Sequence, residues 1–331
     1  FIENTGIYYT LKQNTFESYS CYEFMVIINK WINFEQKYYN NSLRQNTRTR
    51  LDSVLYETLI NKNMEKFTNS STGLKHMLIN NMIEQLELFY NLCRLSPTSF
   101  KIFCTTIKQY VIDAGFSITN ELKTATKPST TIVINMIDFY DKMRNIIKKS
   151  FNDNPQINKH VFDGFRSVIN NNIKFIEIFV MYIDLVLKYK IEKSEEKILE
   201  KFADFINIVH LIQDKDIFID IYRSMMGRRI LKSQWSEDLE RQFITELKLN
   251  FGANYTYKLE NMFTDIKTSK ELVVKYNKYD SSDGFTPMVL TCNRWSFISF
   301  TPTHPFIANN FQKFKNFYSL IHNKRTLKWS G

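Results

Sequence analysis

The sequence predicts a mainly α-helical protein with more than one hydrophobic core. Apolar residues recur every three or four positions along most of the chain, the spacing of an amphipathic helix. Only 8 Gly and 6 Pro occur, which favours long helices over turn-rich β structure. A length of 331 residues exceeds the usual size of a single core, and the 44% hydrophobic and 15% aromatic content argues against disorder.

Residues 214–270 show the helical spacing most clearly and predict three consecutive amphipathic helices. The first places an apolar stripe at Ile217, Phe218, Ile221, Tyr222, Met225 and Met226. In the second, Leu239, Phe243, Leu247 and Phe251 step by four, and Gly252 follows where a helix end favours a left-handed residue. The third begins near Tyr255. Helices this short are marginal alone, so they must pack together as a bundle.

Upstream of this stretch, the same spacing predicts a series of further helices. They cover 1–40 (two helices), 51–82 (two, separated at 69–73 by Gly73), 84–95, 99–114, 132–151, 157–169, 172–190 and 194–212. Ser194, followed by two Glu, is a typical start for the last of these. The polar stretch 40–50 and the Pro-containing stretch 124–131 are predicted connections.

Downstream of residue 270, the pattern changes from purely helical to mixed. Residues 279–284 resemble a turn, 288–291 form a short β-prone run, and 309–322 return to a helical stripe. Residues 326–329 alternate with the period of a strand. This order predicts a small α/β module that the chain cuts short, and the start at Phe1 without Met is that of a fragment.

Charge and cysteine content exclude several function classes. The net charge of +10 favours an acidic partner, although Lys and Arg also simply solvate helix surfaces. Four cysteines without CxxC spacing predict neither a zinc site nor a disulfide framework, and indicate reduced thiols in the cytoplasm or nucleus.

The most apolar run, 176–187, is too short for a membrane span. Isolated histidines and the lack of nucleotide-binding motifs predict no metal, no cofactor and no catalytic activity.

Four blocks, in the same order, resemble the cullin family. They are Asp216-Ile217-Phe218 (cullin KDxF), Arg228 to Leu231 ((A/G)(K/R)RLL), Leu247-Lys248 before Gly252 (SKLK) and Thr256 to Ile266 (TxKLExMFxD). Further matches are Gly73 to Leu78, Ser150 to Asp153, Val289 to Thr291 with Trp295, and Phe317-Tyr318 with 322–329. Asn293, Ser296 and Asn323 depart from the family pattern, in which Gly, Pro and Gly stand at these places.

The resemblance implies a division of the chain into four parts. Residues 1–45 would end the second cullin repeat, 46–190 would form the third, 191–275 a four-helix bundle, and 276–331 the truncated start of an α/β domain. The expected architecture is therefore mainly α, with stacked helical cullin repeats followed by a four-helix bundle and a small α/β module.

The resemblance also implies a function, because cullins are non-catalytic scaffolds of ubiquitin ligases. A RING-box protein would add a strand to the C-terminal module. The residues expected to bind it are Leu327, Lys328, Trp329, Val289, Leu290 and Thr291, and Trp295 is expected to be buried. A substrate adaptor would bind a first repeat that lies outside this sequence, as does the lysine that accepts a ubiquitin-like modifier. No membrane partner is expected.

A basic cluster of Arg228, Arg229 and Lys232 is a second candidate contact. By the resemblance, it would attract the acidic tail of a ubiquitin-conjugating enzyme. The alternative is that these cations only compensate the helix dipole and are solvated.

A competing reading of the whole chain is a basic helical repeat protein that binds nucleic acid. Lys and Arg scattered among Asp and Glu argue against it, because such binding needs the cations along one surface.

Overall fold

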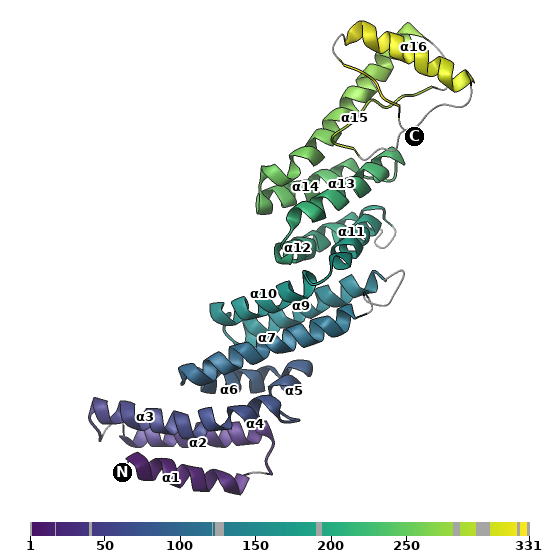
Figure 1. The fold of residues 1–331 in the computed structure, drawn as a ribbon. Coiled ribbons are helices and arrows are strands. Elements are labelled where there is room, and N and C mark those ends of the chain that lie inside the picture. Colours follow the sequence, from purple (N-terminus) through teal and green to yellow (C-terminus); the bar gives the residue numbers. More distant parts are fainter. Residues whose placement is uncertain are drawn as a thin grey trace. The chain divides into compact units, whose positions relative to one another are not determined.

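A computed structural model describes residues 2–16, 18–39, 42–120, 122, 129–189, 194–280, 285–295, 305–322 and 325–329 (Figure 1). Helices dominate this part of the chain, and no strand occurs among its residues, so the predicted mainly α class is confirmed. No helix within these ranges combines the length and apolarity needed to cross a bilayer. The predicted connection at 124–131 and turn at 279–284 fall mostly outside the described residues.

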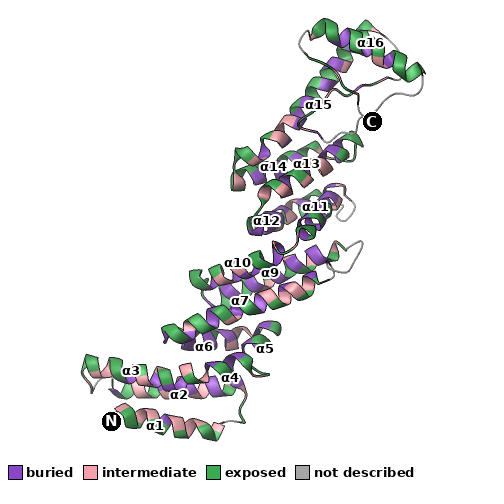
Figure 2. Cartoon of the chain, in the orientation of Figure 1, coloured by how far each residue is buried: buried purple, intermediate pink, exposed green. Residues whose placement is uncertain are grey.

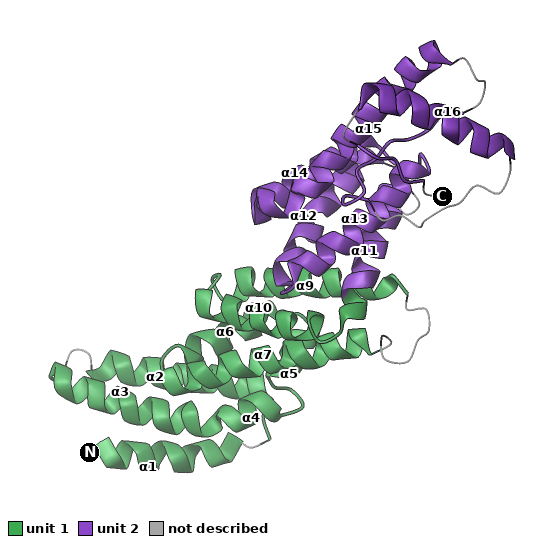
Figure 3. Cartoon of the chain, turned by 45° about the horizontal axis from the view of Figure 1, so that its top comes forward, with its two compact units in different colours: residues 1–175 green, residues 176–331 purple. Residues whose placement is uncertain are grey.

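The chain forms two compact units, 1–175 and 176–331, which are described separately (Figure 3). Helix α11 (Ile173–Leu187), assigned above to the third repeat, falls mostly in the second unit. The four-part division by cullin repeats stays a prediction. Within each unit, the helices bury one face and expose the other, as the spacing of apolar residues requires (Figure 2).

The first unit is a stack of helices with a continuous aromatic interior. Its helices are α1 (Ile2–Gln13), α2 (Cys21–Tyr39), α3 (Gln45–Leu59), α4 (Met64–Asn69), α5 (Leu74–Ile79), α6 (Ile83–Cys93), α7 (Pro97–Thr119), α9 (Thr131–Ser150) and α10 (Pro155–Ile169). Fully buried rings contact one another in series through Phe24, Phe67, Phe89, Phe103 and Phe151. This series links α2, α4, α6 and α7 with the end of α9 into one core.

Small residues set the close approach of α7 and α10. A Cβ at Gly115 would lie 2.8 Å from Val168, and one at Gly164 would lie 3.0 Å from Val111. A side chain at Gly115 would overlap Val168, and one at Gly164 would force Val111 to shift slightly, so packing rather than backbone conformation favours glycine at both positions. Packing also favours glycine at position 73, the predicted helix break, because a Cβ there would lie 2.6 Å from a backbone oxygen.

The second unit contains the predicted bundle. Its helices after α11 are α12 (Glu195–Leu211), α13 (Lys215–Leu231), α14 (Glu237–Phe251), α15 (Ala253–Tyr279) and α16 (Pro305–Ile321). The three helices predicted over 214–270 are confirmed, although α15 continues to Tyr279. Gly252 has a φ of 94°, as its place after α14 predicted. Ser194 precedes α12, but its side chain makes no capping hydrogen bond.

The predicted strands at 288–291 and 326–329 are wrong for this structure. Within the described ranges, neither segment pairs with another, and neither is assigned regular structure. A strand requires a neighbour for its backbone groups, whereas the amides of Val289 and Thr291 donate to side chains of α15. The small α/β module is therefore not confirmed by the described residues.

Candidate functional site

An aromatic core between α15 and α16 forms the base of the candidate site. Leu272 and Tyr276 of α15 pack with residues of α16, namely Phe314, Phe317 and Tyr318. The ring of Tyr276 lies 4.9 Å from Phe314 and 5.2 Å from Phe317, centroid to centroid. Burial of rings on this scale makes α15 and α16 a single packed platform.

Two segments that are distant in sequence meet on this platform. Val289 from the first, and Leu327 and Trp329 from the second, are partly buried against the aromatic core. The indole of Trp329 stacks on Phe311 with centroids 3.7 Å apart and planes 13° apart. The structure thus brings together the two groups of residues predicted to bind a RING-box protein, with Lys328 exposed between the two packed side chains.

The carboxylate of Asp265 holds the first segment against α15. It accepts hydrogen bonds from the backbone N–H of Thr291 (3.1 Å), the Thr291 hydroxyl (2.9 Å), Arg294 Nη1 (2.8 Å) and Trp295 Nε1 (2.9 Å). Trp295 is 4% exposed, which confirms the prediction that it is buried. Its ring packs beside Gly227 of α13, where a Cβ would lie 3.4 Å from the indole, an ordinary van der Waals contact.

A second hydrogen bond fixes the direction of the backbone in this segment. The N–H of Val289 donates to Ser269 Oγ at 2.8 Å, so Val289 and Thr291 both turn their amides toward α15. Leu290, between them, has no backbone hydrogen-bond partner among the described residues. An incoming strand could therefore pair with Leu290.

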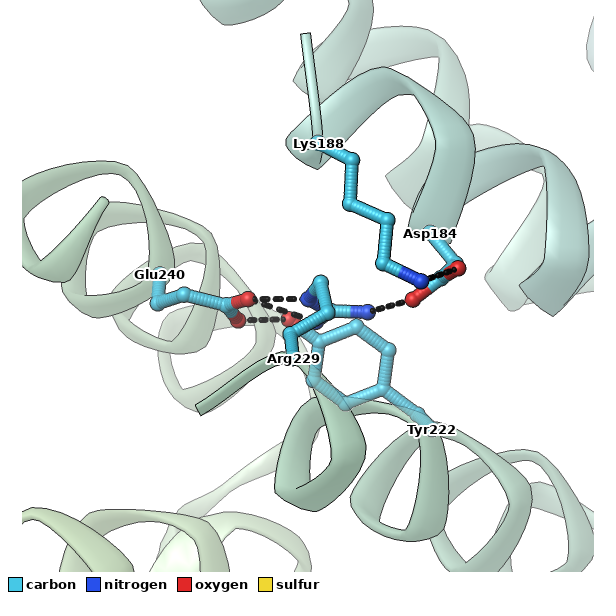
Figure 4. A network of polar contacts seen from close by, with 5 residues as sticks. All are labelled: Asp184, Lys188, Tyr222, Arg229 and Glu240. Atoms are coloured by element: carbon cyan, nitrogen blue, oxygen red, sulfur yellow. Dashed lines mark hydrogen bonds and ion pairs between the residues drawn. The ribbon is translucent and has the colours of Figure 1, made fainter. Parts of the chain in front are cut away.

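The basic cluster is divided by the structure. Arg228 and Lys232 are exposed at the end of α13, whereas Arg229 is 0% exposed. Its Nε donates to Glu240 Oε1 at 2.6 Å and its Nη1 donates to Asp184 Oδ1 at 2.6 Å (Figure 4). The interpretation of Arg229 as a surface contact is therefore wrong, because its charge is already satisfied inside the protein.

The carboxylates around Arg229 have further partners. The Tyr222 hydroxyl donates to Glu240 Oε2 at 2.6 Å, and Lys188 Nζ lies 2.6 Å from Asp184 Oδ2 (Figure 4). Burial is the largest single influence and acts to lower the pKa of Arg229, but Glu240, Tyr222 and Asp184 together outweigh it, so the net pKa is raised. Burial, followed by the same carboxylate, raises the pKa of Tyr222 well above its ordinary value. The network ties α11, α13 and α14 together and is structural.

Sequence reasoning missed this network, although one signal pointed to it. Asp184 stands inside the most apolar run of the chain, where an unpaired charge would be costly. Its partner lies 45 residues away, a separation that no local pattern reveals. The described residues also contain no group of His, Cys, Asp and Glu side chains arranged to hold a metal.

The comparison with known families decides the identity of this helical chain. A model of the cullin alpha solenoid domain matches residues 1–273. The chain belongs to the cullin family. It is 26% identical to Cullin-3B of Arabidopsis thaliana and to Cullin-3 of Dictyostelium discoideum, and 27% identical to Cullin-1 of Dictyostelium discoideum. Each comparison covers 99% of this cullin chain but only 46%, 44% and 45% of the respective relative. The chain thus spans less than half the length of these relatives.

Proposed function

We propose that this cullin chain is a non-catalytic scaffold subunit of a cullin–RING ubiquitin ligase. The observation that carries the proposal is the family match, which extends over all of the first unit and most of the second. Helices that each pack on their neighbours hold attached partners in fixed positions, because every element is braced by the next. In this role the chain contributes geometry, while the partners contribute the chemistry of ubiquitin transfer.

The platform of α15 and α16 is the proposed docking site for a RING-box protein. Support comes from the packing of Val289, Leu327 and Trp329 on one aromatic core. Further support comes from Leu290, whose backbone groups are available for strand addition, a mode in which main-chain hydrogen bonds provide the affinity. Asp265 and Ser269 would hold this edge in place before the partner arrives, which lowers the entropy cost of binding.

Capture of a RING-box protein tests the docking site. Leu290→Pro removes the backbone N–H that an added strand would use, whereas Leu290→Ala keeps it. We expect co-expressed RING-box protein to co-purify with the unchanged chain and with Leu290→Ala, and to be lost from Leu290→Pro and from a chain ended before Thr326. Circular dichroism checks that each variant keeps its helices. Equal capture by all four chains would place the docking edge elsewhere.

The exposed cations Arg228 and Lys232 remain the proposed contact for the acidic tail of a ubiquitin-conjugating enzyme. Exposed charges act mainly on the rate of encounter, and salt screens them. Reversal of both to Glu should therefore slow association, most strongly at low salt, while Arg229 and its network stay intact. Stopped-flow association rates that do not change at any salt concentration would refute this contact.

A further inference from the structure

The first unit carries a pocket that the proposed scaffold role does not use. Its volume is about 300 Å³, and it lies between the second half of α9 and the first half of α10. Tyr140, Arg144 and Ile147 line it from α9, and Asn158, Lys159 and Phe162 line it from α10. The volume is at the lower end of the range for ligand pockets, which suits one or two side chains better than a cofactor.

The floor of the pocket is apolar. Ile147 and Val161 are buried at 2% and 4% exposure, and the aromatic side chains of Tyr140 and Phe162 are half-buried, which leaves part of each accessible. An apolar side chain entering the pocket would remove this surface from water, which favours binding.

The rim of the pocket is cationic. The guanidinium of Arg144 lies 5.9 Å from the centroid of Tyr140, and no carboxylate of the described residues comes within ion-pairing distance of it. The charge of Arg144 does act on Asp141, one turn earlier on α9. Burial raises the pKa of Asp141, and the positive charge of Arg144 opposes that rise. Lys159 is exposed on the facing helix. Two cations, neither in an ion pair with a carboxylate of the described residues, therefore border an apolar floor.

The orientation of α10 adds to this positive field. The helix begins at Pro155, with Asn154 as its cap, so Asn158 and Lys159 lie within the first turns at the positive end of the helix dipole. The amide of Asn158 donates to Asp153 Oδ1 at 2.8 Å, which orders the wall at this end. The carboxylate of Asp153 opposes the helix dipole at this end, so the positive charge of the pocket comes mainly from Arg144 and Lys159.

We propose that this pocket binds an acidic segment of a partner protein through a carboxylate and a neighbouring bulky apolar side chain. The carboxylate would bind Arg144, whose planar guanidinium can accept it in bidentate geometry, with Lys159 as the second cation. The apolar side chain would lie on the floor formed by Ile147, Val161 and Phe162. This surface belongs to the first unit and does not depend on the RING-box site proposed above.

Fluorescence anisotropy with the full chain tests this inference. The probe is a fluorescein-labelled peptide Glu-Asp-Glu-Phe-Asp-Glu. One comparison peptide has Ser in place of Phe, and another has Gln and Asn in place of the acids. The pocket variant combines Arg144→Glu with Lys159→Glu. The matched control combines Lys101→Glu with Lys267→Glu, two exposed cations outside the pocket, and changes the net charge by the same amount.

We expect the pocket variant to weaken binding by about tenfold or more, and the control by less than about twofold, since specific ion pairs outweigh general attraction. The Ser peptide should bind several-fold more weakly than the Phe peptide, and the neutral peptide should not bind. Equal weakening by both variants, or no saturable binding at millimolar peptide, overturns the proposal. Tighter, Arg144-dependent binding of a labelled single-stranded oligonucleotide also overturns it in favour of a nucleic-acid contact.

Discussion

Replacement of Arg229 by Met tests whether the buried network stabilises the second unit. The change removes the cation between Glu240, whose side chain is 1% exposed, and Asp184, at 12%. Among the described residues, Glu240 would keep the Tyr222 hydroxyl as its side-chain partner, while Asp184 would keep Lys188. Removing one member of a buried ion pair lowers the free energy of unfolding by about 3–5 kcal/mol. Because each carboxylate keeps one partner, we expect a loss of about 3 kcal/mol here.

This loss should be measurable as a shift of the melting temperature. For a unit of this size, about 3 kcal/mol corresponds to a decrease of about 6–12 °C. Tryptophan fluorescence is the suitable signal, because Trp235, Trp295 and Trp329 lie in 176–331 and only Trp31 lies outside. Arg228→Met is the matched control, since it removes an exposed cation from the adjacent position of the same helix.

A double substitution separates lost attraction from the cost of an orphaned charge. Combining Arg229→Met with Glu240→Gln removes the unpaired carboxylate, so the double variant should melt above Arg229→Met. The reasoning fails if Arg229→Met melts within about 1 °C of Arg228→Met, because exposed charges contribute little to stability. It also fails if Glu240→Gln lowers the melting temperature of Arg229→Met further.

Two other substitutions and a set of thiol measurements probe separate parts of the chain. Asp265→Asn should loosen the segment it holds and speed tryptic cleavage after Arg294, as followed by mass spectrometry. Gly115→Ala should destabilise the first unit by about 1–3 kcal/mol through overpacking, as measured by urea unfolding. Cys292 is the exposed thiol and should react with Ellman's reagent in the folded chain. Burial raises the pKa of Cys21 from 9.0 to about 11, so this buried thiol should not react with the reagent. For the same reason, the free energy of unfolding of the first unit should fall as the pH rises from 9 toward 11.

Each of these has a control on the same element or in the same assay. Glu271→Gln changes an exposed carboxylate of α15 and should leave tryptic cleavage unchanged. Ser117→Ala, on α7 and away from the valine contact, should leave urea unfolding within about 0.5 kcal/mol. Stability falls at alkaline pH because the Cys21 thiol loses its proton at a lower pH in the unfolded chain than in the folded chain. A Cys21→Ala variant with an equally steep loss between pH 9 and 11 would contradict its assignment to Cys21.

Local periodicity predicted the helices well, since the information for a helix lies within a few turns. The four-residue steps from Leu239 to Phe251 fixed α14 and its end at Gly252, because both depend only on neighbouring residues. The strands at 288–291 and 326–329 failed for the opposite reason. Alternation predicts which residues suit a strand but supplies no neighbour, and side chains of α15 took the amides instead.

The candidate sites were predictable only in part. Val289 meets Leu327 and Trp329 because α15 packs on α16. Residue spacing does not reveal this packing, so only the resemblance to cullins grouped these residues. Arg228 and Arg229 look equivalent in sequence, yet one is exposed and the other is buried. Adjacent residues of a helix point to different sides, so Arg229 faces the interior while Arg228 faces solvent. Carboxylates on two other helices then pair with Arg229.

The four hydrogen bonds on Asp265 also have a kinetic consequence. Since one carboxylate receives the Thr291 amide, the Arg294 guanidinium and the Trp295 indole, these groups cannot be released one at a time at low cost. The segment should open as one cooperative unit, with a free energy below that of unfolding α15. Native-state hydrogen exchange should then give the Thr291 amide and the Trp295 indole one shared rate, and the edge proposed for the RING-box protein would be either fully formed or fully released.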